Sequence, residues 1–492
     1  MTDPSTCNHP RIVVTAARGG SGKTIFSLGL LRALVHKGHK PAPFKKGPDY
    51  IDAKWLGLAS KNPCHNLDPF LMDQETMLAS FMARSRDRDM SIVEGNRGLY
   101  DGVDVKGTSS TGELAKLLKS PVLVVMDCSK TTRTAAAMLL GLQAMDRQVD
   151  IKGVVLNHIA GTRHERIVTD SIENLTGLKV LGVIPRLKKD PIPMRHLGVT
   201  PVDEHPYAEK SLDALGNLMR ENIDLDRVLA LAKEAPLLPR PQNHSLFATN
   251  TLQKGLRIGV MMDEAFQFYY PENLEALRMN GGEIQVISAI SFDRVPDIDL
   301  LYIGGGFPET SAERLANNVN FRKSLKELIE AGLPVYAECG GFMYLGRSIS
   351  YKDATYPMVG VLDYDFLVEK RPQGHGYTIL HVEEPTPFFE QGMRLHGHEF
   401  HYSKALRLKG VSKSHLTCSV IRGRGIEDGL DGAVYKNVFA TYTHIHALQQ
   451  KDFGIRLLRA ALVFKKAGTS PFRPGAACTR EIPGTERLEN WS

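Results

Sequence analysis

The sequence lacks the features of a disulfide-stabilised, zinc-binding or membrane-spanning protein. Its six cysteines are scattered over 492 residues, and no two of them form a CxxC pair. This spacing argues against a disulfide framework or a zinc ribbon and favours a reducing compartment. No apolar run approaches the ~20 residues that a membrane-spanning helix needs, and the N-terminus does not begin a basic-then-apolar signal peptide. We therefore expect a cytoplasmic protein without a membrane partner.

The sequence also lacks a strong charge of either sign. Its formal net charge is +6, which is mild for this length. A charge this diffuse does not indicate a nucleic-acid-binding protein, although it is compatible with a small polyanionic substrate. The composition, with 42% hydrophobic and 24% charged residues, is that of a globular protein, and the length suffices for two or three domains.

A glycine-rich phosphate-binding loop is the clearest motif near the start of the chain. An apolar strand pattern over residues 11–16 runs into ARGGSGKT (residues 17–24), and an amphipathic helix pattern follows. In such a loop the backbone N–H groups cradle phosphates, the lysine meets the outer phosphates, and the threonine hydroxyl can hold Mg2+. The alternative is an ordinary strand-to-helix turn. The residues that the phosphate interpretation selects are Gly20, Gly22, Lys23 and Thr24.

Two further segments place charged side chains near strand ends. FKKGPDYID (residues 44–52) follows a strand-like start, and EGNRGLYDG (residues 94–102) follows an apolar strand. Lysines and carboxylates together suit a site that binds both anions and a metal ion, although the first segment alone could be a solvated loop. A carboxylate at a strand end beside a phosphate loop, here Glu94, is the expected second metal ligand. Asp101 lies in a glycine-flanked loop where it could reach a substrate.

The rest of the first half predicts an α/β domain with a parallel sheet. Apolar strand patterns at residues 122–127, 151–157 and 180–185 alternate with helical patterns. Continuous apolar strands separated by helices indicate a parallel sheet that is covered on both faces. Ligands of such sheets bind at the carboxyl ends of the strands, where Asn157 is a candidate for an adenine contact.

Composition and periodicity divide the chain into five segments. A proline-rich stretch after residue 236 separates the two α/β halves, and apolar periodicity fades after about residue 467. The predicted segments are an N-terminal tail (1–10), a phosphate-binding α/β domain (11–205), a helical segment with a linker (206–254), a second α/β domain (255–465) and a disordered tail (466–492).

The second half is organised around a cysteine between a strand and a helix. VYAECGGFM is an apolar strand that ends on Cys339, two glycines and a new helical pattern, as in a nucleophile elbow. Gly340 opens that helix, and Gly305 and Gly306 end another strand, so their backbone N–H groups could form an oxyanion hole. A cysteine nucleophile needs a nearby base, usually histidine, but 17 histidines are too many for spacing alone to select one. The alternative is an ordinary buried cysteine at a strand end.

A histidine-rich segment leaves a metal-site alternative open. RLHGHEFHY (residues 394–402) contains three histidines and a glutamate, which are zinc-binding residue types. Their spacing differs from that of the HExxH motif, and this argues against zinc. The residues concerned are His396, His398, Glu399 and His401.

Taken together, these motifs resemble the cobyrinate a,c-diamide synthase family. In chain order the matching segments are Lys23-Thr24, FKKGPDYID, EGNRGLYDG, MRHLG, DEAFQFYYPENL, YIGGGFPE, AECGGFMYL and GHEFHYS, within residues 11–462. The resemblance implies a P-loop parallel-sheet synthetase domain, similar to dethiobiotin synthetase, followed by a class I glutamine amidotransferase α/β domain. It further implies an enzyme that uses ATP, Mg2+ and L-glutamine to amidate the a- and c-carboxylates of a tetrapyrrole through an acyl phosphate.

The resemblance also gives roles to individual residues. Cys339 corresponds to the glutaminase nucleophile and His444 to its base, whereas His446 stands where the class usually has a glutamate, which implies a catalytic dyad. Together with the motifs it selects Thr24, Asp49 and Glu94 for Mg2+; Gly20, Gly22, Lys23, Thr24, Lys45 and Asn157 for ATP; Asp49, Tyr50, Ile51 and Asp101 for the substrate carboxylates; and Gly305, Gly306 and Gly340 for the oxyanion hole.

Departures from the family pattern leave the substrate open. Asn96 and Arg97 replace two apolar residues of the usual EGVMGLFDG. Related enzymes that amidate siroheme, sirohydrochlorin or nickel-sirohydrochlorin resemble this framework, and PCHNLD (residues 63–68) favours the siroheme amidase. A ParA/MinD-like ATPase switch would account for the first half of the chain alone. A homodimer is compatible with the resemblance, and the order in which carboxylates react stays open.

Overall fold

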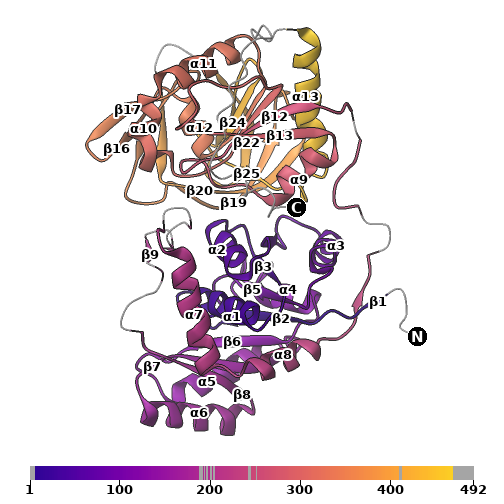
Figure 1. Ribbon diagram of the computed structural model, residues 1–492, viewed down its shortest axis with the longest axis vertical. Helices are drawn as coiled ribbons and strands as arrows, with labels where there is room; N and C mark the ends of the chain where they lie inside the picture. The colour runs from indigo at the N-terminus through magenta and orange to yellow at the C-terminus, as the bar shows by residue number, and fades with distance from the viewer. Residues whose placement is uncertain are drawn as a thin grey trace. The chain divides into compact units, whose positions relative to one another are not determined.

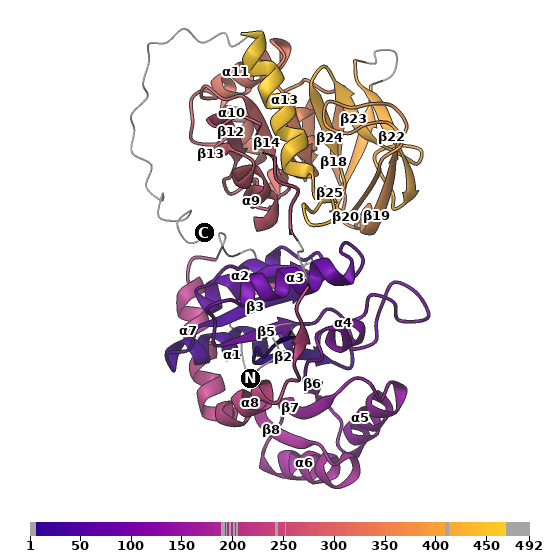
Figure 2. The same cartoon turned by 90° about the vertical axis from the view of Figure 1, so that its right-hand side faces the viewer.

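The chain forms two units, which meet in sequence between Ser245 and Leu246 and are described one at a time (Figures 1 and 2). The computed structural model describes residues 6–187, 192, 194–195, 198–199, 202, 205–241, 245–250, 252–408 and 413–468. The disordered tail predicted for residues 466–492 lies outside the described residues from residue 469 on.

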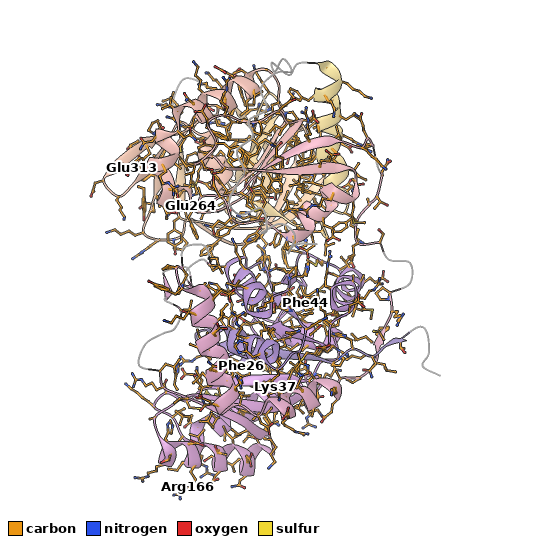
Figure 3. The ribbon with its side chains drawn as sticks, in the orientation of Figure 1. Phe26, Lys37, Phe44, Arg166, Glu264 and Glu313 are labelled. Atoms are coloured by element: carbon orange, nitrogen blue, oxygen red, sulfur yellow. The ribbon has the colours of Figure 1, made fainter. Side chains whose placement is uncertain are left out.

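The first unit is built on a seven-stranded sheet in which every neighbouring pair of strands is parallel. Its central strands are buried along their whole length, as expected for a parallel sheet covered on both faces. Phe26 and Phe44 are fully buried, whereas Lys37 and Arg166 lie at the surface of the unit (Figure 3). In sheet order the strands are β4 (His65–Leu67), β3 (Pro41–Lys46), β5 (Met90–Glu94), β2 (Arg11–Ala16), β6 (Val122–Asp127), β7 (Ile151–Ile159) and β8 (Lys179–Pro185).

Helices α7 and α8 contribute side chains to the core of the first unit. A Cβ atom on Gly29 of α1 would lie 2.6 Å from the Met219 side chain of α7, so the glycine lets the two helices approach closely. Arg32 of α1 pairs with Asp213 of α7 at 2.7 Å. The helices are α1 (Lys23–His36), α2 (Ile51–Ser60), α3 (Gln74–Ser85), α4 (Thr111–Leu117), α5 (Arg133–Met145), α6 (Thr162–Thr176), α7 (Ala208–Asn222) and α8 (Leu225–Lys233).

Two short strand pairs accompany this sheet. Strand β1 (Thr6–Cys7), which lies within the predicted N-terminal tail, pairs with β11 (Leu238–Pro239). Strand β9 (Met194–Arg195) pairs with β10 (Gly198–Val199). Both pairs are antiparallel. The first of them joins the start of the described chain to the segment that follows α8.

The second unit contains a ten-stranded sheet that is parallel at one end and antiparallel at the other. The parallel part is built from apolar strands, and β14, β15 and β24 are buried throughout. In sheet order the strands are β13 (Gly282–Ile287), β12 (Leu256–Met261), β14 (Leu300–Ile303), β15 (Val335–Glu338), β24 (Val438–Thr441), β23 (Leu430–Tyr435), β22 (His415–Arg422), β19 (Gly374–Val382), β20 (Arg394–His401) and β25 (His444–Ile445).

A smaller sheet and several helices complete the second unit. Phe342 of α12 and Tyr364 of β18 belong to its main hydrophobic core. The four strands of the smaller sheet, in order, are β17 (Ala354–Pro357), β16 (Ser348–Tyr351), β18 (Tyr364–Val368) and β21 (Ser403–Arg407). The helices are α9 (Pro271–Met279), η2 (Pro308–Ser311), α10 (Ala312–Asn317), α11 (Val319–Glu330), α12 (Gly340–Leu345) and α13 (Phe453–Ala467).

The predicted α/β class is confirmed, with a parallel sheet in the first unit and a mixed sheet in the second. The antiparallel strands from β19 to β23 were not predicted individually. β19 and β22 mix buried and exposed positions, so they lack the continuous apolar runs that marked the parallel strands. No helix within the described residues is long and apolar enough to cross a membrane.

Candidate active sites

The phosphate-binding loop lies between the buried strand β2 and helix α1. Gly20 and Gly22 have φ angles of +74° and +92°, which favour glycine. A Cβ atom on Gly22 would lie 2.2 Å from Asn157 Nδ2, and that amide donates to the Ser21 carbonyl at 3.0 Å. Asn157 therefore lies against the loop itself, and its described contact supports the loop conformation.

The Lys23 side chain is held beside the loop and is largely buried. Its ammonium donates to the Arg97 carbonyl at 2.6 Å and lies 3.5 Å from the Arg18 carbonyl. Burial lowers the pKa of Lys23, and the nearby Glu94 carboxylate opposes that effect. The lysine thus links the phosphate loop to the EGNRGLYDG segment, as two parts of one site.

A buried cluster of charged groups forms where β3, β5 and α2 meet. Lys45 of β3 is the register partner of Glu94 of β5, and its ammonium lies 2.6 Å from both Glu94 Oε1 and Asp52 Oδ2. The Thr24 hydroxyl donates to Glu94 Oε1 at 2.8 Å and lies 3.4 Å from Asp52 Oδ2. Adjacent parallel strands bring these ends together, as expected for the ligand-binding edge of such a sheet.

Asp52 belongs to this cluster, although the sequence did not select it. Asp49, which it did select, accepts a hydrogen bond from the Asp52 backbone N–H at 2.9 Å. Burial and the neighbouring Asp52 carboxylate raise the pKa of Asp49 to about 7. Tyr50 and Ile51 lie at the start of α2 and are half-buried. Because α2 begins at Ile51, Asp52 lies in the first turn of the helix and its N–H reaches the Asp49 side chain. The contribution of Asp52 to the site could have been predicted only from the position of this helix start.

The charged cluster fits a hard divalent cation. Glu94 is fully buried, and its Oε2 atom has no hydrogen-bond partner among the described residues. Carboxylate and hydroxyl oxygens are the donors that Mg2+ prefers, and Mg2+ usually takes only one or two protein carboxylates with phosphates and waters. No set of three or more His, Cys, Asp or Glu side chains within the described ranges is arranged to hold a metal ion. The oxygen atoms of Thr24, Asp52 and Glu94 fit the few protein ligands that such a cation takes beside phosphates and waters.

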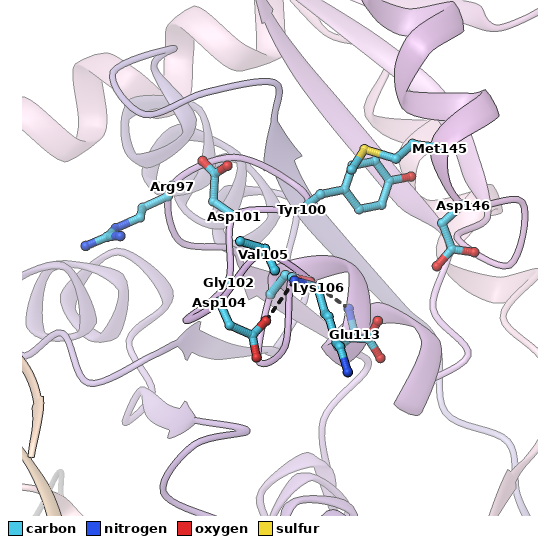
Figure 4. Close-up of a pocket in the computed structure, with 12 residues that line it drawn as sticks. Arg97, Tyr100, Asp101, Gly102, Asp104, Val105, Lys106, Glu113, Met145 and Asp146 are labelled. Carbon is cyan, nitrogen blue, oxygen red and sulfur yellow. Dashed lines mark hydrogen bonds between the residues drawn. The ribbon is translucent and has the colours of Figure 1, made fainter. Parts of the chain in front are cut away.

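Asp101 lines a cavity of about 390 Å3 in the first unit (Figure 4). Its Oδ2 atom accepts a hydrogen bond from the Gly98 N–H at 2.8 Å, which fixes the loop, and its side chain is otherwise exposed. Arg97 lines the same cavity, while its carbonyl holds Lys23. The cavity therefore adjoins the phosphate loop, where a substrate carboxylate would need to lie.

Cys339 occupies a strained turn between β15 and α12. Its φ and ψ angles are +47° and −99°, a conformation that a residue other than glycine rarely adopts. Its N–H donates to the Thr441 carbonyl at 2.7 Å, and its thiol lies 3.9 Å from the Phe400 carbonyl. Burial raises the pKa of the Cys339 thiol, while the Gly340 N–H opposes that rise. This geometry is that of the predicted nucleophile elbow, with a thiol that is neutral at rest.

His444 is brought next to this turn by strand pairing. Its register partner on β20 is His398, and the two rings stack at 4.9 Å with an interplanar angle of 24°. His444 Nδ1 lies 3.4 Å from Glu338 Oε2, one residue before Cys339. Strand β20 supplies both His398 beside the imidazole and the Phe400 carbonyl beside the thiol. The predicted nucleophile and base therefore share one buried site.

The three glycines selected for the oxyanion hole have different surroundings. The Gly305 N–H donates to the Phe268 carbonyl at 3.3 Å, and a Cβ atom on Gly305 would lie 2.4 Å from His444 Cε1. A Cβ atom on Gly340 would lie 3.0 Å from the Gly306 nitrogen, so these two residues are neighbours. Gly306 and Gly340 thus stay candidates for the oxyanion hole. The Gly305 N–H is paired with the Phe268 carbonyl, and the lack of a side chain at Gly305 leaves space for the His444 ring.

The remaining buried histidines have partners of their own. His446 Nε2 lies 3.5 Å from Glu272 Oε2, and both residues are fully buried. Glu399 and His401 come within 3.7 Å of each other, but strand alternation directs His396 and His398 to the other face of β20. The zinc alternative therefore finds no support in the described part of the chain.

Comparisons with known proteins find one family match in each half of the chain. Residues 12–199 match the family described as "CobQ/CobB/MinD/ParA nucleotide binding domain", and residues 257–452 match "CobB/CobQ-like glutamine amidotransferase domain". A solved structure titled "Crystal structure of glutamine amidotransferase" is 21% identical, with a TM-score of 0.31, and the match covers 43% of this chain and 100% of that one.

Curated relatives match almost the whole chain. The cobyrinate a,c-diamide synthase of Magnetococcus marinus is 40% identical, and the match covers 89% of this chain and 94% of the relative. The enzyme of the same name from Archaeoglobus fulgidus is 37% identical, and that match covers 92% of this chain and 98% of the relative. With a nucleotide-binding unit and a glutamine amidotransferase unit, this chain is a glutamine-dependent ligase. It belongs to the cobyrinate a,c-diamide synthase family.

Proposed function

We propose that this enzyme amidates the a- and c-carboxylates of cobyrinate, with ATP to activate each carboxylate and glutamine to supply the nitrogen. The observation that carries this proposal is the pairing of two sites in a chain that matches synthases of that name over nearly its whole length. One site combines a phosphate loop with a buried carboxylate cluster. The other combines a strained thiol with a histidine.

In the glutaminase half, the Cys339 sulfur attacks the side-chain amide of glutamine. His444 takes the thiol proton and returns it to the departing nitrogen, so that ammonia leaves and a thioester stays on Cys339. Water then hydrolyses the thioester to glutamate. Gly306 and Gly340 are neighbours, and their backbone N–H groups would stabilise the developing oxyanion.

In the synthetase half, the carboxylate must be activated because an ionised carboxylate is a poor acyl donor to ammonia. Lys23 and Lys45 bind the ATP phosphates, and Asp101 orients the substrate carboxylate from the adjoining cavity. Thr24, Asp52 and Glu94 would hold Mg2+, which neutralises phosphate charge when bound. Transfer of the γ-phosphoryl group gives an acyl phosphate, and ammonia displaces phosphate from it to give the amide.

A second substrate class is favoured by one observation. Arg97, which replaces an apolar residue of the family pattern, lines the cavity with Asp101. A guanidinium there suits a substrate with an additional carboxylate near the reacting one. The alternative substrates are siroheme, sirohydrochlorin and nickel-sirohydrochlorin, with the same chemistry.

Product analysis by mass spectrometry tests these assignments. The enzyme is incubated with ATP, Mg2+ and glutamine, together with cobyrinate, siroheme, sirohydrochlorin or nickel-sirohydrochlorin in separate reactions. We expect a diamide from cobyrinate that requires both ATP and glutamine. Amidation of siroheme or a sirohydrochlorin, without amidation of cobyrinate, would show that this compound and not cobyrinate is the substrate. Glutamine hydrolysis without any amidated tetrapyrrole would contradict the proposed function, and absence of hydrolysis would favour an ATPase switch.

A further inference from the structure

We propose that Glu338 is a positioning residue that holds the His444 imidazole, so that the glutaminase site is a Cys–His–Glu triad whose carboxylate precedes the nucleophile in sequence. This inference rests on the proposed roles of Cys339 and His444. It differs from the dyad that the sequence implies, because the histidine at position 446 left the usual place of the carboxylate empty.

The position of Glu338 follows from strand pairing. Glu338 ends β15 and is the register partner of Thr441, the last residue of β24. Three residues later the chain presents His444, whose Nδ1 atom lies 3.4 Å from Glu338 Oε2. The Ile445 N–H donates to Glu338 Oε1 at 3.1 Å, so the carboxylate contacts both the imidazole and the backbone of β25.

The remaining contacts of Glu338 come from neutral donors. The Tyr336 hydroxyl donates to Oε1 at 2.8 Å, and the Tyr302 hydroxyl donates to Oε2 at 3.3 Å. Burial raises the pKa of both tyrosines well above the usual value, so both stay protonated donors. No lysine or arginine in the described part of the chain pairs with Glu338, which is 1% exposed. The cation that this buried carboxylate can pair with is the imidazolium of His444.

This arrangement orients the base for proton transfer. With Nδ1–H directed at Glu338, the other ring nitrogen, Nε2, is left unprotonated and can accept the Cys339 thiol proton. The ring is confined further by His398, which stacks on it, and by Gly305, which leaves no space for a Cβ atom next to Cε1. When Cys339 gives its proton to His444, the Glu338 carboxylate stabilises the positive charge of the new imidazolium, because it lies 3.4 Å from Nδ1.

The molecule offers a matched control for this pair. His446 and Glu272 form a second imidazole–carboxylate pair at 3.5 Å, and all four side chains are at most 2% exposed. Glu338→Gln and Glu272→Gln therefore remove the same charge from equally buried sites. Only the first change removes the partner of the base.

The test measures kcat and KM for glutamine hydrolysis and the rate of Cys339 alkylation by iodoacetamide. For Glu338→Gln we expect kcat to fall about 10²- to 10⁴-fold, with KM within about twofold and slower alkylation, whereas amidation driven by ammonium salts stays unchanged. Glu272→Gln should keep kcat within about threefold. An unchanged kcat for Glu338→Gln, or equal losses in both variants, would overturn the inference.

Two further variants keep the test decisive. Glu338→Asp keeps the charge but withdraws it from Nδ1, so kcat should fall at constant KM even where Glu338→Gln does not fold; a wild-type kcat would overturn the inference. Cys339→Ala separates this inference from the proposed function. Glutaminase activity in Cys339→Ala would overturn the function itself, whereas its loss there and retention in Glu338→Gln would overturn only the positioning role.

Discussion

The two candidate active sites stabilise their carboxylates with different partners. In the first unit, Glu94 and Asp52 share the ammonium of Lys45 at 2.6 Å. In the second unit, Glu338 is held by tyrosine hydroxyls, a backbone N–H and a histidine. The first site therefore carries permanent charges of both signs, as binding of phosphate and a cation requires. The second site has no lysine or arginine beside its carboxylate in the described residues, so a positive charge appears there only when His444 is protonated.

This difference matches the chemistry of the two halves. Phosphoryl transfer needs fixed charges around a highly charged substrate. Thiol attack on an amide begins from neutral groups and separates charge only during the reaction. Burial raises the pKa of the Cys339 thiol, so the proposed mechanism needs a base beside it, which is the role proposed for His444.

The largest expected effect comes from breaking the charge balance of the first site. Lys45→Met leaves the buried Glu94 and the partly buried Asp52 without their ammonium, which should destabilise the protein by about 3–5 kcal/mol and abolish amidation with either glutamine or ammonium. Glutamine hydrolysis by the second unit should persist. Urea unfolding and product analysis measure the two effects. Lys37→Met is the control, because the exposed Lys37–Asp226 pair should contribute at most about 1 kcal/mol; equal losses in both variants would contradict the comparison.

A buried carboxylate in the second unit sharpens the comparison through pH. Asp431 is fully buried, accepts hydrogen bonds from the Gly432 and Tyr442 N–H groups, and has its pKa raised to about 7, first of all by burial. The folded state then holds the proton more tightly than the unfolded state, so stability falls as pH rises from about 4 to 7. At about 1.4 kcal/mol per unit, this change amounts to at most about 4 kcal/mol.

Asp431→Asn should remove that part of the pH dependence. We expect the free energy of unfolding of the variant, relative to the wild type, to increase between pH 4 and 7 and to stay level above pH 8. Urea unfolding at a series of pH values measures this difference. Parallel stability curves for the two proteins would show that Asp431 is ionised in the folded state throughout the range.

A smaller effect is expected from crowding the base. A Cβ atom on Gly305 would lie 2.4 Å from His444 Cε1, so Gly305→Ala forces the imidazole to move. A displacement of about 1 Å can cost about 10²-fold in rate, and we expect kcat for glutamine hydrolysis to fall by that order. Amidation from ammonium should be unaffected. A wild-type kcat in this variant would mean that the position of the ring is not critical.

Local motifs were sufficient to find part of each site. The phosphate loop, Glu94 at its strand end and Cys339 in its elbow are all marked by glycines or strand ends that sequence alone displays. The α/β class also followed, because buried parallel strands are continuous apolar runs.

The residues that sequence reasoning missed depend on contacts that no local pattern encodes. Asp52 turns toward Thr24 only because α2 begins at Ile51. Glu338 reaches His444 across 106 positions of sequence, and this contact needs the pairing of β15 with β24. The sequence predicted no carboxylate beside His444, because His446 stands where the class usually has a glutamate; in the fold, His446 lies 3.5 Å from Glu272. Long-range strand pairing, not residue type, therefore decides which carboxylate serves the base.

The most direct test of the two-site account is the nitrogen source used by Cys339→Ser. The account predicts that this variant makes no amidated product from glutamine and makes it at the wild-type rate from ammonium salts, because the first unit keeps its charged site. Amidation from glutamine at the wild-type rate, or loss of amidation from both sources in a folded variant, would contradict the account.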